Sequence, residues 1–303
     1  MIYEYIYIYI VCVYLMNSKN KFFVIIIIKY GMTDVGKVPD QNNYKSVAIL
    51  IECDNQSSLG LACQRDVVNV GRRLVKSDPN WSIYILTNTP NYFSKFIAEV
   101  NSGSAVRVRE IYSRQNRLTF EQIINKAKFD NNGVINQLYI HVTGHGYSSS
   151  DSSRNELDGR SEYVVTPTQT LSDITLYNIL QKNLDKNTKI RISVDCCHSG
   201  TFSNLQYQYK NKSFVNAVKN PKPYFENAWS ISSCLDSQSS MNDIGEYSGF
   251  GGSLTVQMLD NEKVFDNFMS DDKNMIISSL DKLAPILLKL KQVPMLLCDK
   301  IIG

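Results

Sequence analysis

Residues 189–200 read KIRISVDCCHSG, and this stretch decides the fold. Its first seven residues are rich in apolar and β-branched side chains, which predicts a buried strand over residues 189–195 that runs directly into reactive side chains. Residues 137–146, QLYIHVTGHG, repeat this arrangement, because a predicted strand over residues 137–143 leads into a histidine between two glycines. Two strands with such ends indicate a site built at strand ends.

The surrounding chain alternates between predicted strands and predicted helices. Further strands are predicted over residues 46–54, 81–87, 228–234 and 294–298, and helices over residues 61–75, 90–100, 118–129, 171–184, 251–259 and 274–290. Thr119 and Gln122 form a capping-box pattern at the start of the third helix, and residues 148–163 are predicted as a surface loop. The alternation predicts an α/β fold, with a mainly parallel central sheet of about six to eight strands flanked by helices on both faces. Ligands bind beyond the carboxyl ends of the strands in such sheets.

The chain has 303 residues, of which 43% are hydrophobic and 20% are charged, which excludes disordered, collagen-like and disulfide-stapled classes. Length alone does not decide between one domain with appendages and two small domains. The formal net charge of +3 is too small to indicate a nucleic-acid or membrane partner. The seven cysteines include no CxxC pair and no zinc-site spacing, so we expect reduced thiols and a cytoplasmic location.

Residues 1–31 differ from the rest of the chain. They hold two apolar runs separated by polar residues 17–21, and neither run is long enough to span a bilayer. Three interpretations stay open: an upstream extension with the working start at Met32, a membrane-associating anchor, or a packed strand. We expect an apolar extension over residues 1–43 before the folded core, and membrane contact only if residues 1–31 are retained.

Cys197 and His145 are the residue types that acyl transfer needs. A cysteine thiolate attacks acyl carbons, and an imidazole within hydrogen-bond reach deprotonates the thiol and later protonates the leaving amine. The peptide N–H groups of Gly146 and Cys197 can bind the oxyanion, a contribution of about 3 kcal/mol for one donor. Of the three histidines, His141 is expected on the opposite face of its strand and His198 adjoins the nucleophile, which leaves His145 as the base.

Each of these residues also has a plainer interpretation. A histidine at a strand end is more often a structural residue than a base. Cys196 and Cys197 could be a packed pair or a redox pair, although adjacent cysteines do not easily form an unstrained disulfide. A zinc site at Cys196, Cys197 and His198 is disfavoured, because consecutive side chains diverge and no other ligand pair is obvious.

Four stretches together resemble the metacaspases, which are clan CD cysteine peptidases of family C14: HVTGHG, DGRSEYVVTP, VDCCHSGTFSNLQYQY and SSCLDSQSS. The similarity runs from about Val47 to Cys298, and DCCHSGT is a highly specific string. The resemblance implies a caspase-like fold and a catalytic dyad of His145 and Cys197. It also implies a cysteine endopeptidase that forms a thioacyl intermediate, cleaves after arginine or lysine, and requires no cofactor.

The resemblance further implies an acidic pocket for the P1 residue, which lies on the amino side of the cleaved bond. Asp195 and Asp66, the latter from a C-x-x-D motif that begins at Cys63, would supply the carboxylates, and Thr143 would line the same pocket. Two carboxylates pair with an arginine or lysine head and repel an acidic one. The plainer interpretation of Asp66 is a solvated helix residue.

Calcium is possible as a cofactor but doubtful. Metacaspases often bind calcium through aspartates, because this cation prefers several oxygen ligands. The corresponding positions here are Ser161, Ser172, Asp173 and Asn204, so only Asp173 keeps its charge and is a weak candidate ligand. We therefore expect weak or absent calcium activation. A different loop site is open to Asp151, Glu156, Asp158 and Glu162.

The resemblance divides the chain into a large-subunit region over residues 44–206 and a small-subunit region over residues 227–303 that completes the same domain. Residues 207–226 are lysine-rich with two prolines, which predicts an exposed linker. We expect a compact member without the prodomain or long insert found in other metacaspases. The linker offers four candidate self-cleavage sites, Lys212 first and then Lys210, Lys219 and Lys222.

We expect protein or peptide substrates with a basic P1 residue, no nucleic-acid partner, and a monomer. Two rival functions stay open. A catalytically silent caspase-like protein would act as a binding scaffold or decoy, which the intact His145 and Cys197 disfavour and the lost calcium carboxylates favour. A thiol redox protein would use Cys196 and Cys197, and mutation of Cys196 alone would then abolish activity.

Overall fold

The computed structural model describes residues 9–17, 20–28, 45–53, 59, 61–101, 108–113, 115–150, 157, 159–239 and 252–301. The chain divides into two compact units, Met1–Asn43 and Tyr44–Gly303. In the first unit, β1 (Tyr9–Asn17) and β2 (Asn20–Ile28) pair as antiparallel strands. The segment therefore contains paired strands, and the choice among its three interpretations stays a prediction. Among the described residues, no helix is both long enough and apolar enough to cross a membrane.

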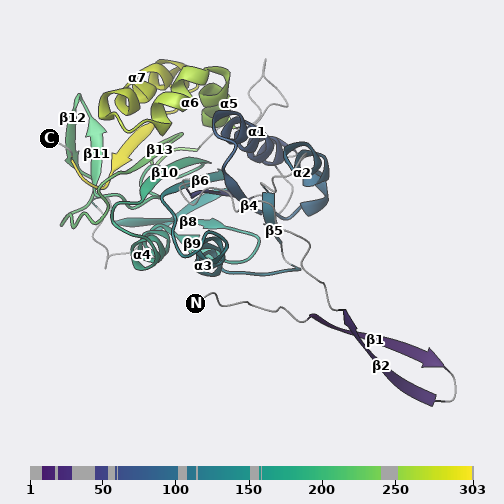
Figure 1. Cartoon of the computed structure of the whole chain (residues 1–303). Coiled ribbons are helices and arrows are strands. Elements are labelled where there is room, and N and C mark those ends of the chain that lie inside the picture. Colours follow the sequence, from purple (N-terminus) through teal and green to yellow (C-terminus); the bar gives the residue numbers. More distant parts are fainter. Residues whose placement is uncertain are drawn as a thin grey trace. The chain divides into compact units, whose positions relative to one another are not determined.

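The second unit is built on a nine-stranded sheet with helices on both faces (Figure 1). Its order is β12-β11-β14-β13-β10-β6-β3-β4-β5. The strands are β3 (Ser46–Cys53), β4 (Ser82–Leu86), β5 (Val108–Tyr112), β6 (Gln137–Gly144), β10 (Lys189–Cys196), β11 (Tyr207–Lys210), β12 (Ser213–Asn216), β13 (Ala228–Ser232) and β14 (Met295–Cys298). From β13 to β5 all neighbours run parallel, whereas β14, β11 and β12 are added antiparallel. The α/β class and the mainly parallel sheet are confirmed.

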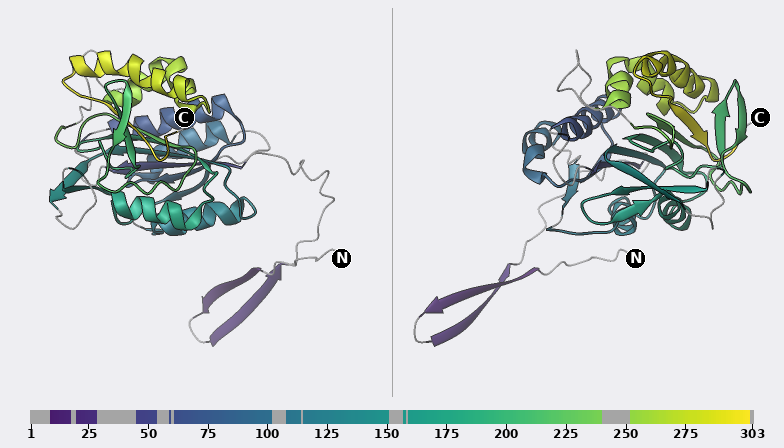
Figure 2. Two further views of the ribbon diagram at one scale, coloured as in Figure 1. Left: turned by 90° about the vertical axis from the view of Figure 1, so that its left-hand side faces the viewer. Right: turned by 180° about the vertical axis from the view of Figure 1, so that it is seen from behind.

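Two helical layers cover the sheet (Figure 2). One face carries α1 (Ala62–Ser77), η1 (Pro90–Phe93), α2 (Ser94–Val100), α5 (Ser253–Asp260), α6 (Glu262–Met269) and α7 (Lys273–Lys289), and the other carries α3 (Phe120–Asp130) and α4 (Asp173–Asn183). In β6, Leu138 and Ile140 pack in the α3 and α4 layer, while Tyr139 packs in the α1 and α5 layer. Burial on both faces explains why the central strands read as nearly continuous apolar runs.

The predicted capping box at the start of α3 is confirmed. The Thr119 hydroxyl accepts a hydrogen bond from the Gln122 backbone N–H at 3.3 Å. The Gln122 side-chain oxygen accepts one from the Thr119 N–H at 2.8 Å. These reciprocal bonds satisfy two of the donors that a helix leaves open at its amino end.

The prediction of an exposed linker over residues 207–226 is wrong for its first half, and the sheet has nine strands rather than six to eight for the same reason. Residues 207–216 form the β11–β12 hairpin, and β11 pairs with β14. Asn211 and Lys212 make the turn with positive φ angles of 50° and 62°, the conformation of a tight hairpin turn. Phe214 packs against Trp229 with ring centroids 5.9 Å apart. The many lysines made this segment resemble a linker, although its aromatic residues pack on the sheet and the hairpin extends it.

The predicted surface loop over residues 148–163 is also partly wrong. Its two ends belong to a separate three-stranded antiparallel sheet, β7 (Gly146–Ser150), β8 (Arg160–Val165) and β9 (Thr170–Ser172). Tyr147 and Tyr163 stack across the first pair with ring centroids 5.5 Å apart. Serine-rich strands lack the apolar alternation by which a strand is recognised, so the sequence pattern concealed them.

Candidate functional site

The two sequence stretches that end in reactive residues lie side by side. Strands β6 and β10 are parallel neighbours, with Thr143 opposite Asp195 and Gly144 opposite Cys196. Because both strands point the same way, the residues that follow them emerge at the same edge of the sheet. His145 and Cys197 are the next residue in each strand's chain, so the predicted dyad is brought together at this edge.

Two glycines allow the His145 segment to lie directly against the backbones of Cys53 and Cys197. Gly144 has φ of +127°, and a Cβ there would lie 2.7 Å from the carbonyl carbon of Cys53. A Cβ on Gly146 would collide with the carbonyl oxygen of Cys197. The His145 N–H donates to the Cys53 carbonyl at 3.1 Å. Close backbone approach therefore requires glycine at both positions.

The adjacent cysteines have different environments. Cys196 is buried, and burial above all raises the pKa of its thiol well above the ordinary value. Cys197 is partly exposed. A buried thiol that resists ionisation is a poor nucleophile, whereas an accessible one beside an imidazole is suited to attack. The structure therefore separates the packing role of Cys196 from the chemical role available to Cys197.

A turn after β13 holds the loop that follows Cys197. The His198 N–H donates to the Gln238 carbonyl at 2.9 Å, and its Nδ1 donates to the Asp236 carbonyl. The Asp236 carboxylate accepts from the Thr201 N–H at 2.7 Å. His198 has a positive φ of 53°. The turn lies within the SSCLDSQSS stretch. The sequence did not predict the contact of Asp236 with this loop, because an aspartate in a serine-rich stretch has no distinguishing spacing.

The four predicted P1-pocket residues come from neighbouring elements, and all are buried. Cys63 and Asp66 lie on α1, Thr143 on β6 and Asp195 on β10. The Thr143 hydroxyl donates to Asp66 Oδ2 at 2.7 Å. Burial raises the pKa of Asp66 well above the ordinary value, and the nearby charge of Asp195 raises it further. Asp66 is therefore not a solvated helix residue.

The amino end of α5 closes over both carboxylates, which sequence reasoning did not foresee. The Gly252 N–H donates to Asp66 Oδ2 at 2.9 Å, and the Thr255 N–H donates to Asp195 Oδ2 at 2.8 Å. A Cβ on Gly252 would collide with Asp195 Oδ2 and lie 3.1 Å from Asp66 Oδ2. No motif in the sequence signals these partners, because a Gly-Ser-Leu-Thr stretch reads only as an ordinary helix start.

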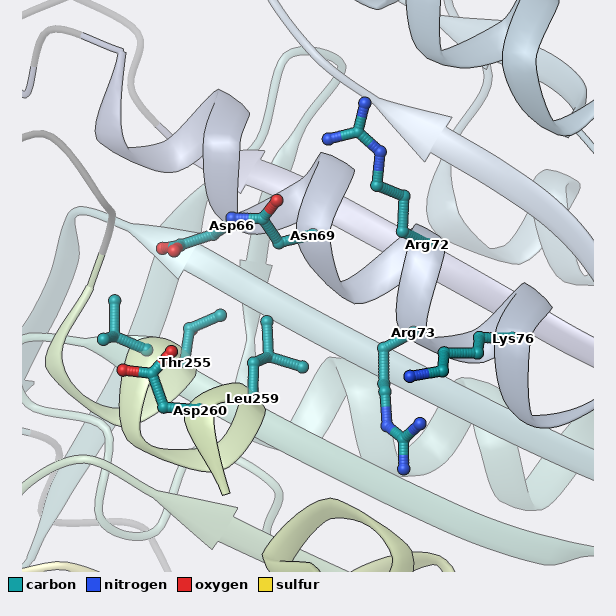
Figure 3. Close-up of a pocket in the computed structure, with 9 residues that line it drawn as sticks. Asp66, Asn69, Arg72, Arg73, Lys76, Thr255, Leu259 and Asp260 are labelled. Atoms are coloured by element: carbon teal, nitrogen blue, oxygen red, sulfur yellow. The ribbon is translucent and has the colours of Figure 1, made fainter. Parts of the chain in front are cut away.

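A cavity of about 430 Å³ between α1 and α5 reaches Asp66 and Thr255 (Figure 3). Its basic side chains are already paired. Arg73 binds Asp266 at 2.5 Å, and Lys76 binds Glu262 at 2.6 Å. The cavity therefore adjoins Asp66, and carboxylates already compensate the charges of Arg73 and Lys76.

His141 lies on a buried face of β6 that it shares with Thr143. Residues 141 and 143 are two apart on one strand, so they share a face. His141 is buried, its Nδ1 lies 2.8 Å from the Ser193 hydroxyl, and burial lowers the pKa of its imidazole to about 3. Burial therefore excludes His141 as the base.

Two of the predicted calcium positions have structural roles at the start of α4. The Ser172 hydroxyl accepts from the Thr175 N–H at 3.2 Å at the start of α4, and Asp173 Oδ1 accepts from the Ile174 N–H at 2.7 Å. Ser161 is buried and Asn204 has a positive φ of 51°. Within the described ranges, no three His, Cys, Asp or Glu side chains gather as a metal site. Of the alternative loop residues, Glu162 is buried on β8, whereas Asp151, Glu156 and Asp158 lie outside the described residues.

All four candidate self-cleavage lysines are exposed, but they occupy different settings. Lys210 ends β11 and Lys212 lies in the hairpin turn. Lys219 and Lys222 follow β12 outside the paired strands, although the Lys222 N–H donates to the Gln206 side chain at 2.8 Å.

Comparisons with known proteins point to one family. A family profile described as "Caspase domain" matches residues 46–302. Metacaspase III c of Phaeodactylum tricornutum is 32% identical over 96 residues, which is 30% of this chain and 27% of that protein. Metacaspase-1 of Saccharomyces cerevisiae strain YJM789 is 28% identical over 135 residues, 43% of this chain and 30% of that protein. The matched stretches thus span less than a third of each relative's length.

The chain also matches solved structures at lower similarity. Caspase-1 from Spodoptera frugiperda superimposes with a TM-score of 0.44 and 11% identity, covering 86% of this chain and 90% of that chain.

Proposed function

Because the chain belongs to the caspase-domain family, we propose that it is a cysteine endopeptidase with Cys197 as nucleophile and His145 as general acid and base. The observation that carries this proposal is that His145 and Cys197 follow the ends of the neighbouring parallel strands β6 and β10, with Gly146 lying directly against the Cys197 backbone. The partly exposed Cys197 beside the buried Cys196 supports the same assignment.

The proposed reaction follows from these residues. His145 takes the proton of the Cys197 thiol, and the thiolate attacks the carbonyl carbon of the P1 residue. The N–H groups of Gly146 and Cys197 hold the resulting oxyanion. The His145 imidazolium then protonates the leaving amine, which leaves a thioacyl enzyme. A water that gives its proton to His145 hydrolyses this thioester and restores the free thiol.

The proposed P1 specificity is for arginine or lysine. Asp66 and Asp195 bring two buried carboxylates to the amino end of α5, and we assign both to the P1 pocket together with Thr143 and Cys63. A guanidinium or ammonium head compensates the mutual repulsion of the two carboxylates, whereas an acidic head would add to it. The substrates we propose are accordingly proteins or peptides with a basic P1 residue.

We propose that the enzyme works as a monomer in the cytoplasm with weak or no calcium dependence. The loss of carboxylates at Ser161, Ser172 and Asn204 supports the calcium part of this proposal, because calcium binds best where several carboxylates converge. Asp173 is the remaining acidic position, and its Oδ1 already accepts a backbone N–H.

The test is cleavage of fluorogenic peptides that end in Arg, Lys or Asp by the full chain, with calcium and with a chelator. Cys197→Ala is the inactive variant and Cys196→Ala its matched neighbour. We expect cleavage after Arg and Lys that persists in chelator, vanishes in Cys197→Ala and survives in Cys196→Ala.

Other outcomes assign the failure to separate parts of the proposal. Cleavage only with calcium would overturn the calcium proposal alone. Loss of activity in Cys196→Ala would favour the redox rival. No cleavage by folded protein under either condition would favour the scaffold.

A further inference from the structure

The amino end of α5 is capped by side chains from outside the helix. Its N-cap residue is Gly252, which has no side chain to accept the open N–H groups of the first turn. Asp66 of α1 accepts from the Gly252 N–H and Asp195 of β10 accepts from the Thr255 N–H. The two carboxylates proposed to recognise the substrate therefore also cap a helix of the other subunit region.

Thr255 makes two hydrogen bonds to one carboxylate oxygen. Its N–H donates to Asp195 Oδ2 at 2.8 Å, and its hydroxyl donates to the same oxygen at 2.9 Å. Thr255 is 2% exposed and lines the cavity between α1 and α5 together with Asp66 (Figure 3). Two donors that converge on one buried oxygen stabilise its negative charge and fix the rotation of the carboxyl group.

We propose that Thr255 is a positioning residue for P1 specificity, which holds the Asp195 carboxylate in the charged form and orientation that a basic P1 head needs. This inference rests on the proposed function, because it assigns Asp195 to the P1 pocket. Thr255 acts through Asp195 and is not a catalytic residue. A substitution of Thr255 can remove the hydroxyl bond to Asp195 while the backbone N–H bond to the same carboxylate stays.

The direct test measures peptide affinity without catalysis, in full-length protein that carries Cys197→Ala. Two fluorescent peptides are compared, one with arginine at P1 and one with citrulline, the neutral isostere of arginine. Thr255→Val removes the hydroxyl with little change of shape, and Thr255→Ser restores it. The control is Thr188→Val, which removes a buried hydroxyl that donates to the Ile135 carbonyl at 3.1 Å and lies before β10 begins.

We expect Thr255→Val to weaken binding of the arginine peptide about tenfold, as the loss of a hydrogen bond to a charged group does. Citrulline binding should stay unchanged, since that peptide does not depend on the charge of Asp195. Thr255→Ser should recover the preference for arginine, and Thr188→Val should keep it. In the active protein the same loss should appear in KM and not in kcat. Alkylation of Cys197 by iodoacetamide should keep its rate.

An unchanged ratio of arginine to citrulline affinity in Thr255→Val would overturn the inference. So would an equal loss for both peptides, because that pattern describes a structural role only. If Thr255→Val lowers the melting temperature by many degrees, Thr255→Ala compared with Thr255→Ser gives the same reading. Failure of the peptidase proposal is visible separately, as absence of cleavage by the protein with Cys197 intact.

Discussion

Burial gives Asp66 a charge state unlike that of a surface aspartate. The pKa of its carboxyl is raised well above the usual value, first by burial and then by the charge of Asp195. Asp66 therefore keeps a proton at pH values where an exposed aspartate has lost it. A basic P1 head has to displace that proton before it pairs with the carboxylates.

The consequence is a pH dependence of substrate binding with a defined sign. The KM for an arginine peptide should fall as pH rises through the raised pKa of Asp66, since the ionised pocket binds the cation better. Asp66→Asn should weaken arginine binding and remove this titration, whereas a citrulline peptide should show little of it. Steady-state kinetics across acid to neutral pH measure both peptides. A KM for arginine that is independent of pH over this range would contradict the assigned pocket.

Some residues of the candidate site can be predicted from the sequence, and others cannot. Strand ends and family resemblance predicted six of them, and the structure brings their elements together. These six are His145, Cys197, Cys63, Asp66, Thr143 and Asp195. Gly252 and Thr255 were missed, because their role depends on α5 lying against α1 and β10. Such a contact between residues far apart in the chain has no local pattern.

At the scale of elements, the strongest local signals gave the right structure. The long apolar strands and the capping box of α3 were predicted, because burial and capping chemistry are written in neighbouring residues. The β11–β12 hairpin, β8 and the helix α6 were missed. The hairpin and β8 are short and rich in polar residues, so the apolar alternation that identifies a strand is incomplete there.

The capping box offers a test of an element away from the site. Thr119→Ala should lower the free energy of unfolding by about 1 kcal/mol, because the Gln122 N–H loses its acceptor. Thr119→Ser keeps the hydroxyl and should keep most of the stability. Urea unfolding of the full chain measures both variants. Equal stability of the alanine and serine variants would show that this cap contributes nothing, and kcat should be unchanged in each.

For the whole molecule, the placement of the lysines decides where self-cleavage can begin. A peptidase binds its substrate extended, and Lys210 and Lys212 lie in a paired hairpin and its tight turn. Lys219 and Lys222 lie outside the paired strands and are exposed. The structure therefore favours the second pair over Lys212, which the sequence alone favoured.

We expect the double variant of Lys219→Gln and Lys222→Gln to slow self-cleavage more than the double variant of Lys210→Gln and Lys212→Gln. A time course on denaturing gels, with Cys197→Ala as the uncut control, measures the difference. An unchanged band pattern when all four lysines become glutamine would remove every one of these sites.

The C-terminal strand β14 lies inside the sheet, between β13 and β11. A cut after Lys219 or Lys222 would leave β11 on the first piece and β14 on the second, still joined by their ladder, while β10 stays paired with β13. The strands β14 and β13 of the second piece would lie between β11 and β10 of the first piece. Produced as two separate polypeptides, they should find each other and reconstitute one particle that a sizing column does not resolve.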